Sequence, residues 1–565
     1  MTPISRTPRL LWRFLAWDVT VILLIATLGL VGVIAFAAAM RPLAEGRVDP
    51  FDAARLAGLL AVPMLQFALP FAAGLAATLG YHRFAAENEA LAAMAGGVSH
   101  RSILFPAAAL GLALSLLLAV LSNEVIPRFL RGAEQLLTRD VTRFIVNPIE
   151  RGETVQIGRW DIRADRVIHA SGADAGRGAG ATEHLVLRGV LAHQVNKPES
   201  FIEADRVDLW LFDDETADEA GGTRAVLRFD RASAYVGPDR LEAQGAFTDS
   251  LRVPSAFRDD PKYLSFRELR EVERTPEMLN RIEWRRRLVA DHLAMRDMIG
   301  DVRHQLENAG AATLLRRGDE FTIRARGLEA LDDGWALLPA KGSAGVVVKV
   351  RLASGGTREH TATHARLSFR SLSSDQGLPA PDEDGSRVWL RLDLEDVATA
   401  GEGGSTGETR ASQQQYSTLT TRSDHVAARL TQPSAEILKA AAATAPAESP
   451  SQSDRDFRRA ATELRTKIDD LKREAFSKVH ERLAFSASCV LMVLCGSIVA
   501  LRLRDALPLQ VYLWSFIPAL VCVITISAGQ GLTHRFGWPG LVLLWGGVAG
   551  LAGLTSVFYA SLRRH

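Results

Sequence analysis

Long apolar runs alternate with charged stretches along this chain, and the apolar runs predict membrane-spanning helices. Six runs contain no Asp, Glu, Lys or Arg, and each is longer than the roughly 18 residues that mark a candidate transmembrane helix. They are residues 19–40, 56–81, 102–123, 483–501, 506–534 and 536–562. The pattern predicts six spans in two groups of three, separated by the charged stretch 124–482.

A polar segment between the second and third runs, residues 81–101, predicts a short amphipathic helix over 84–97 at a membrane surface. Phe84, Leu91, Met94, Ala95 and Val98 fall on one side of such a helix, and Glu89 points the opposite way. Glu87 and Glu89 lie near its amino end, where negative charge is favoured, and Gly96-Gly97 is the expected stop. We expect this helix to contact a partner; the alternative is a simple connector between two spans.

The charged stretch begins with a β pattern. Apolar residues alternate with Arg and Asp at period two from about residue 155 to 247, which predicts antiparallel strands of a jelly-roll-like domain within residues 126–260. Val186, Leu209 and Leu227 are expected on its inner face.

The rest of the stretch divides by composition. Residues 261–399 predict an inserted helical and β segment, and residues 400–453, rich in Gly, Ser, Thr, Gln and Ala, predict a disordered linker. A charged helix over 454–482 then leads into the last three spans, 483–565. The fold class is therefore membrane α-helical, with six spans in a 3+3 arrangement, plus an all-β outer domain and a partly disordered insertion.

Arginine distribution predicts orientation. If the amino terminus is cytoplasmic, the inner segments hold Arg6, Arg9, Arg13, Arg83, Arg101, Arg502, Arg504, Arg563 and Arg564, and the short outer loops hold Arg41, Arg47, Arg55 and Arg535. Nine against four obeys the positive-inside rule, so both termini and the 84–97 helix are expected in the cytoplasm and the large domain outside. The first span lacks a nearby cleavage site and is expected to remain as an anchor. The net charge of +1 indicates nothing about partners, and no nucleic-acid partner is expected.

Candidate chemistry is sparse. All three cysteines, at 489, 495 and 522, fall in spans, so the outer domain is expected to fold without disulfides. His360 and His364 would lie about 13 Å apart in a strand with no third ligand, so no metal site is predicted. A G-x-S-x-G match at 403–407 lacks its strand and helix context, and no P-loop sequence occurs. No catalytic residue or cofactor is therefore predicted in this chain.

The second span carries Pro63, Pro70 and Gln66, which is unusual for a simple anchor and indicates packing in a bundle beside a cavity. We expect Gln66, Phe67 and Phe71 to line a substrate cavity. Arg41, at the outer end of the first span, is expected to join them and attract an anionic headgroup; its alternative role is a snorkelling anchor.

Several passages together resemble the LptF/LptG lipopolysaccharide-export permease family, also called YjgP/YjgQ. They are ENEALAAMAGGVS after the second span, ALPFAAGL within it, NEVIPR after the third span, and VHERLAFSASCVLMVLCGSIVALRLR around the fourth. Glu89 and Gly97 match the acidic residue and the glycine of the family's coupling helix. The resemblance covers about residues 1–270 and 470–565.

The resemblance implies one permease subunit of an ABC exporter. Its partners would be a cytoplasmic LptB-like ATPase, which holds ATP and magnesium, a second LptF/LptG-like permease and an LptC/LptA-like periplasmic bridge. Glu87, Glu89, Leu91, Met94 and Gly97 would couple to the ATPase, and the outer domain would be periplasmic on an inner-membrane protein. Two departures stand out: residues 261–453 are added material, and Ala35 replaces a lysine that some members carry in the first span.

Other classes remain as alternatives. A membrane-anchored scaffold or sensor would use the outer domain to bind a protein and the 84–97 helix only as a linker. Exporters of the lipoprotein-release type have four spans, and six spans argue against them. No acidic pair or Ser/Lys/His constellation lies within the spans, which argues against an intramembrane hydrolase.

Overall fold

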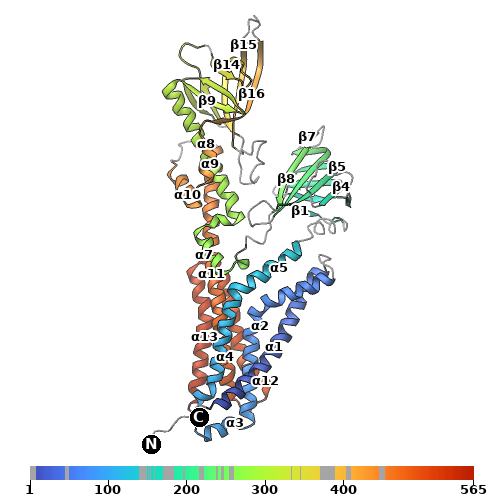
Figure 1. The fold of residues 1–565 in the computed structure, drawn as a ribbon, viewed down its shortest axis with the longest axis vertical. Coiled ribbons are helices and arrows are strands. Elements are labelled where there is room, and N and C mark those ends of the chain that lie inside the picture. Colours follow the sequence, from blue (N-terminus) through green and yellow to red (C-terminus); the bar gives the residue numbers. More distant parts are fainter. Residues whose placement is uncertain are drawn as a thin grey trace. The chain divides into compact units, whose positions relative to one another are not determined.

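The computed structural model describes residues 8–44, 50–138, 149, 152, 154–157, 160–169, 183–194, 197–214, 222–236, 239–242, 247–253, 260–331, 334–343, 345–369, 388–401, 409–444 and 452–564 (Figure 1). The chain forms two compact units. The first combines Met1–Glu271 with Lys472–His565, and the second is Val272–Leu471.

Among the described residues, six helices are long and apolar enough to cross a membrane, which confirms the six predicted spans; α11 begins in the second unit and continues into the first from Lys472. They are α1 (Arg9–Ala44), α2 (Pro50–Ala86), α4 (His100–Val120), α11 (Gln452–Arg502), α12 (Pro508–Phe536) and α13 (Trp538–Leu562). A π-helical turn, Leu121–Val125, continues α4 into α5 (Ile126–Thr138). The charged helix predicted over 454–482 and the fourth span are one continuous helix, α11.

Small residues allow the membrane helices to approach closely. A Cβ atom at Gly496 of α11 would lie 2.6 Å from Thr78 Oγ1 of α2, so any larger residue there would force the two helices apart. Thr78 also hydrogen-bonds Ser515 of α12 at 3.0 Å. Close backbone approach and polar contacts of this kind are the usual basis of helix association in membranes, because lipid removes the hydrophobic contribution. Pro63 and Pro70 are both accommodated inside α2.

The outer strands of the first unit form an antiparallel sheet, as predicted. The strands are β1 (Val155–Ile157), β2 (Trp160–Arg163), β3 (Arg166–His169), β4 (Glu183–Gln194), β5 (Lys197–Asp214), β6 (Gly222–Val236), β7 (Asp239–Glu242) and β8 (Phe247–Val253). Their order is β1-β2-β4-β5-β6-β7, with β3 also on β4 and β8 also on β6. The described strands therefore belong to one hydrogen-bonded sheet, in agreement with the predicted all-β outer domain.

The pairing register of β4, β5 and β6 shows which residues share a face of this sheet, and it corrects the prediction for Val186. Leu185, Leu209 and Leu227 stand opposite one another on β4, β5 and β6, and all belong to the buried apolar core. Val186 pairs with Asp208, one position along, and so faces the other way. Leu209 and Leu227 lie on the core face as predicted, but the inner-face assignment of Val186 was wrong, because the alternation of β4 was read one residue out of phase.

The second unit combines helices with a second antiparallel sheet. Its helices are α7 (Phe266–Arg274), which begins in the first unit, α8 (Asn280–Ala309), α9 (His425–Leu430) and α10 (Ser434–Ala443), with short 3₁₀ turns at Pro261–Tyr263, in the first unit, and Pro276–Met278. Its strands are β9 (Ala311–Arg316), β10 (Asp319–Arg324), β11 (Gly327–Leu331), β12 (Gly334–Leu338), β13 (Val346–Arg351), β14 (Thr357–Phe369), β15 (Leu390–Gly401) and β16 (Thr409–Thr421).

The strands β13, β10, β9, β16, β15 and β14 close on themselves as a barrel, because β14 pairs with both β13 and β15. The β11–β12 hairpin extends from β14. Phe321, Ile323 and Val348 are fully buried in this sheet, with His360 only 2% exposed among them. A barrel of this size is filled by its own side chains, so it is a packed core and not a lipid channel.

The predicted disorder of residues 400–453 is wrong for the part of that range that the structure describes. Residues 409–421 form β16, and 425–430 and 434–443 form α9 and α10. Barrel closure explains the order of β16: β15 and β9 satisfy its backbone hydrogen bonds, and its Leu419 is fully buried. Composition alone missed this because β16 is stabilised by pairing with β15 and β9, and the polar composition of β16 does not reveal these partners.

Candidate functional site

The predicted surface helix over 84–97 is shorter than expected and begins later. α2 continues to Ala86, a turn follows, and α3 spans only Glu89–Ala95. Asn88 interrupts the helix because it adopts a left-handed conformation, with φ of 61°, which asparagine tolerates better than most residues. Phe84 and Glu87 therefore belong to the end of α2 and to the turn, and not to the helix that carries Glu89.

This break changes which side of α3 is buried. Ala90 is the residue of α3 that is buried, and Ala93 and Met94 are partly buried against the bundle. Leu91, predicted on the apolar face, is 50% exposed, and Ala95 is exposed. The prediction failed for these two residues because it assumed one unbroken helix from Phe84.

The acidic side chains of the segment face outward. Glu87 and Glu89 are both exposed, one in the turn and one in the first turn of α3. Both lie close to the amino end of α3, where the unpaired backbone N–H groups add partial positive charge. The two carboxylates therefore form an accessible acidic edge that a basic group on a partner could contact.

Gly97 ends α3 in a defined motif. The N–H of Val98 donates to Ala93 O at 3.0 Å, and the N–H of Gly97 donates to Met94 O at 2.9 Å, which is the Schellman pattern. Gly97 has φ of 86°, a left-handed value that other residues adopt at a cost. The sequence-predicted role of Gly97 as a stop is thus visible in its backbone geometry.

Three contacts hold the base of this segment, and the sequence analysis did not predict them. Arg83 pairs with Asp18 of α1 at 2.6 Å, Tyr81 donates to Ile103 O at 3.0 Å, and Trp12 donates to Ser102 O at 2.8 Å. An available signal was the charge pattern: Asp18 directly precedes the first apolar run, and Arg83 lies two residues after the end of the second, at the same ends of antiparallel helices. These contacts fix the ends of α1, α2 and α4 around α3.

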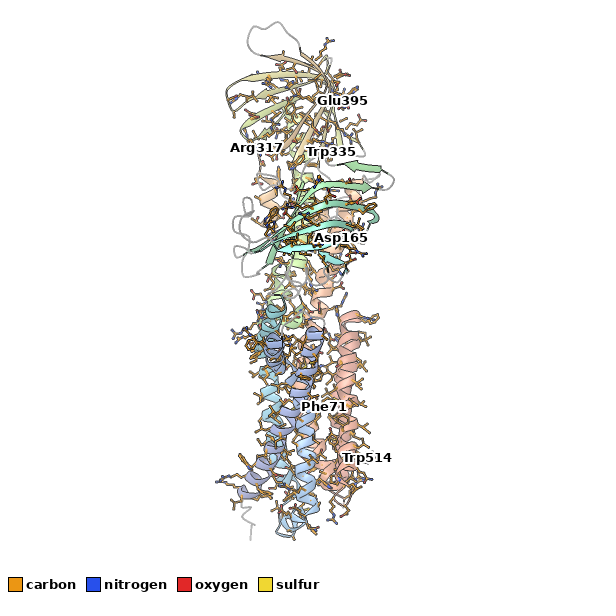
Figure 2. All side chains as sticks on the ribbon, turned by 90° about the vertical axis from the view of Figure 1, so that its right-hand side faces the viewer. Phe71, Asp165, Arg317, Trp335, Glu395 and Trp514 are labelled. Atoms are coloured by element: carbon orange, nitrogen blue, oxygen red, sulfur yellow. The ribbon has the colours of Figure 1, made fainter. Side chains whose placement is uncertain are left out.

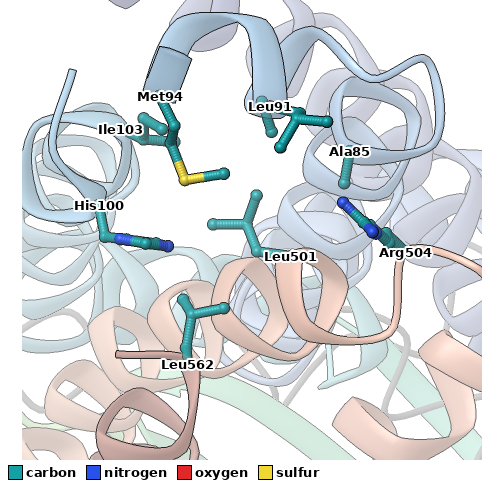
Figure 3. Close-up of a pocket in the computed structure, with 9 residues that line it drawn as sticks. Ala85, Leu91, Met94, His100, Ile103, Leu501, Arg504 and Leu562 are labelled. Carbon is teal, nitrogen blue, oxygen red and sulfur yellow. The ribbon is translucent and has the colours of Figure 1, made fainter. Parts of the chain in front are cut away.

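A hollow of about 40 Å³ lies beneath α3 (Figure 3). Leu91 and Met94 of α3 line it from one side, and Leu501 at the carboxyl end of α11 and Leu562 at the end of α13 line it from the other. The remaining lining residues are Ala85, Ala90, His100, Ile103 and Arg504. Leu91 and Met94, both predicted for ATPase coupling, therefore meet at one feature of the structure.

Three of the predicted cavity residues, Gln66, Phe67 and Phe71, lie on α2, beside α11 and α12, and the fourth, Arg41, lies on α1. The ring of Phe67 meets Phe485 edge-on with centroids 5.3 Å apart, and Phe71 packs against Phe516 at 5.6 Å. Phe67 remains 40% exposed, while Gln66 and Phe71 are half-buried. Figure 2 labels Phe71 within the bundle and Trp514 on α12. The Arg41 side chain lies outside the described residues.

At the other end of the bundle, an ion pair joins α5 to α7. Arg131 contacts Glu268 through two hydrogen bonds of 3.0 and 3.4 Å. Burial opposes ionisation of Glu268, but hydrogen bonds from Ser265 and the Arg131 guanidinium outweigh it and hold the pKa of Glu268 below its usual range. Ser265 and Glu268 also cap α7 reciprocally, with Ser265 N–H donating to Glu268 at 2.6 Å.

A comparison with known protein families indicates which kind of protein carries this segment and bundle. A family model described as "Lipopolysaccharide export system permease LptF/LptG" matches residues 11–290. Over these residues, the chain belongs to the LptF/LptG permease family. The match includes the first three spans, α3 and the first β sheet. A comparison with curated proteins finds no match to this chain.

Family membership confirms the resemblance drawn from ENEALAAMAGGVS and its companion passages. It makes the chain a multi-pass inner-membrane protein of the lipopolysaccharide-export permease type, which is a transporter component and is not typically an enzyme. The LptF/LptG family also implies association with other components of the Lpt system. The match ends at residue 290, so it does not extend over the barrel of the second unit.

Proposed function

We propose that this chain is the permease half of an ABC exporter that extracts lipopolysaccharide or a similar glycolipid from the inner membrane. In this proposal, both termini and α3 are cytoplasmic, the first β sheet and the second unit are periplasmic, and the glycolipid passes to a periplasmic bridge protein. The observation that carries the proposal is α3 itself, a short helix with exposed carboxylates between two membrane helices of an LptF/LptG-type chain.

The ATPase step belongs to a partner. An LptB-like cytoplasmic ATPase would supply ATP hydrolysis with its own magnesium, and α3 would be its docking element. Glu89 is the central contact, because it is exposed in the first turn of α3, whereas Ala90, the next residue, is buried. A carboxylate in this place favours a basic or hydrogen-bond donor group on the ATPase.

The lipid path would begin in the membrane bundle and continue along the sheet. Phe67 and Phe71 offer apolar contact surface to acyl chains where α2 meets α11 and α12. The core face of the first sheet, with Leu209 and Leu227, offers the next apolar surface. A second LptF/LptG-like permease would complete the cavity, and α1 and α12 expose bulky apolar residues, such as Phe36 (63%) and Trp514 (61%), to the surrounding lipid or to that partner.

Co-purification tests this function. Affinity purification of the tagged chain from its own membranes is expected to recover an ABC ATPase and a second permease, and lipid mass spectrometry of the complex is expected to find a bound glycolipid. Recovery of periplasmic protein partners without an ATPase would instead support a membrane-anchored scaffold.

A further inference from the structure

Three arginines stand directly opposite one another on neighbouring strands of the first sheet. Arg166 of β3 pairs with Arg188 of β4, and Arg188 pairs with Arg206 of β5. Directly paired residues share one face of a sheet, and Arg188 lies two positions from Val186, so this arginine row is on the face opposite the apolar core. Like charges in this register destabilise a sheet, because their Cβ atoms lie only about 5 Å apart. The arginine row therefore needs negative charge beside it.

The acidic residues of this face are already engaged by other groups. Asp208 is 4% exposed, and it accepts two hydrogen bonds from Arg206, at 3.0 and 2.8 Å. Asp208 also contacts His184 at 3.0 Å. Asp230, which stands opposite Arg206, pairs with Arg228 at 3.3 Å. Arg206 is therefore compensated, and the charges of the other two arginines are not.

Arg166 and Arg188 are the part of the arginine row that is open to a ligand. Both are exposed, and neither forms an ion pair with any residue that the structure describes. Asp165, labelled in Figure 2, precedes Arg166, but its carboxylate lies beside Gly189, where an added Cβ atom would be 2.2 Å from Asp165 Oδ2. The Asp165 N–H donates to Arg188 O at 3.0 Å, which holds β3 to β4 next to the two arginines. Their backbones are thus fixed, while their guanidinium groups remain accessible.

Two neighbouring guanidinium groups suit a phosphate better than a single carboxylate. Each guanidinium presents a planar set of N–H donors that binds two oxygens of one anion. The two oxygens of a carboxylate satisfy one such group, whereas the three terminal oxygens of a phosphate monoester can be shared between two groups. The pair therefore favours a phosphate as its ligand.

We propose that Arg166 and Arg188 form a binding site for a phosphate group, and that the headgroup of the exported glycolipid carries this phosphate. Among the described strands β3 pairs only with β4, so the arginine row ends at an edge of the sheet. The headgroup would pass round this edge, and the acyl chains would stay along the core face. Val186 shares the face of the arginines but is only 7% exposed, so it is covered and lies outside the site. This proposal rests on the proposed function, since that function supplies the glycolipid.

Chemical modification of arginine in the full-length, detergent-purified protein tests the site. Phenylglyoxal reacts with accessible guanidinium groups, and peptide mass spectrometry gives the rate at each arginine. Lipopolysaccharide at about ten times its dissociation constant is expected to slow modification of Arg166 and Arg188 by about tenfold. The same lipid after phosphatase treatment should protect neither residue. Arg231 of β6 is the internal control, because 83% of its side chain is exposed and Asp205 already pairs with it.

Arg188→Gln tests whether the two groups share one ligand. Arg166 should lose most of its protection in this variant, whereas Arg188→Lys should keep part of it, because lysine retains the charge without the planar set of donors. The proposal would be overturned if lipopolysaccharide protected neither arginine, or if Arg166 were protected equally with and without Arg188.

Two further results would overturn the assignment of the ligand. Inorganic phosphate that protects both arginines as well as the lipid does, at the same concentration, would show that the site takes free phosphate. Protection that appears only when a partner protein is added would show a protein contact instead. Absence of both the ATPase and the glycolipid from the purified complex would contradict the proposed function, whatever the arginines bind.

Discussion

Glu89 and Gly97 belong to the same short segment but act through different physical properties. Glu89 offers a charge on an exposed surface, so its contribution depends on what binds there. Gly97 offers a backbone conformation, so its contribution is already present in the isolated chain as the end of α3. A substitution at Glu89 should therefore change partner binding, whereas a substitution at Gly97 should change the structure of α3 itself.

Glu89→Arg should release the ATPase from detergent-purified complexes. Loss of a charge-assisted interface contact costs about 2 to 5 kcal/mol, which would weaken assembly by more than roughly tenfold. ATPase content per permease, measured on stained gels, checks this. Asp505→Arg is the matched control, since Asp505 is a 92% exposed acidic residue in the α11–α12 turn. Stoichiometric ATPase in the Glu89 variant, with full lipid-dependent turnover, would show that α3 is not the coupling helix.

His360 makes the barrel of the second unit sensitive to acid. Its ring nitrogens hydrogen-bond Thr399 at 2.9 Å and Tyr416 at 2.8 Å, and burial, aided by the charge of Arg358, lowers the pKa of His360 below its ordinary value. The unfolded chain binds a proton as pH falls through about 6.5, while the folded barrel does not. Barrel stability should therefore be full above that pH and decline below it.

Hydrogen exchange of β14 and β16, corrected for intrinsic exchange rates, measures this decline in the full-length protein. Protection should fall between about pH 7.5 and pH 5.5 in the unmodified chain. His360→Gln should remove most of this dependence, because glutamine does not titrate. Equal dependence in both proteins would assign the effect to other groups.

Among the elements, the end of α3 follows from its local sequence, whereas the order of β16 does not. α3 carries its own stop signal in Gly96-Gly97, and the structure uses it. β16 has a polar sequence, TRASQQQYSTLTT, with little apolar content of its own. It is ordered because two neighbouring strands pair with it.

Gly97→Ala should loosen the end of α3. A left-handed residue with a Cβ atom costs about 1 to 2 kcal/mol, so retention of the ATPase should fall by up to about 5- to 30-fold. Gly96→Ala is the matched control, because Gly96 has φ of −76° and its added Cβ would make only ordinary contacts of 3.4 Å or more. If the two variants behave alike, the conformation of Gly97 does not matter for assembly.

Residues 409–444 should resist limited proteolysis. Trypsin sites at Arg410, Arg422, Arg429 and Lys439 lie in or beside β16, α9 and α10, and Arg429 is held by Asp297 of α8 at 2.7 Å. Cleavage at these four positions should appear only after denaturation, when mapped by mass spectrometry. Early cleavage at them under native conditions would contradict the structure of this region.

At the scale of the whole molecule, the first β sheet offers an apolar surface for a lipid path, whereas the filled barrel does not. The barrel is closed and filled, and its strands begin after the family match ends at residue 290. The open sheet of the first unit has one apolar face that continues across three strands. A lipid path through the outer region is therefore expected along the sheet and not through the barrel.

Photocrosslinking residues placed on the two faces of the sheet test this path. Probes at Leu209 and Leu227 should label glycolipid during ATP turnover, because both positions lie on the core face. A probe at Val186 should label much less, since it shares β4 with Leu185 but points to the opposite face. Equal labelling at all three positions, or labelling without ATP, would contradict transport along this face.

The sequence alone was sufficient for the features that depend on local composition. Apolar length identifies a membrane helix wherever the helix packs, so all six spans were predictable. The family signature around Glu89 and Gly97 was equally local. Gly97 ends a helix through its own backbone freedom, which needs no distant neighbour.

Tertiary structure decided the features that depend on distant partners. The order of β16 depends on pairing with β15 and with β9, the latter about a hundred residues earlier, and the face of Val186 depended on its register with Asp208. The left-handed turn at Asn88 shifted which residues of α3 are buried. The hollow beneath Met94 is formed where the ends of α11 and α13 bring Leu501 and Leu562 opposite α3. Pairing, register and packing are set by long-range contacts, which residue patterns within one segment do not contain.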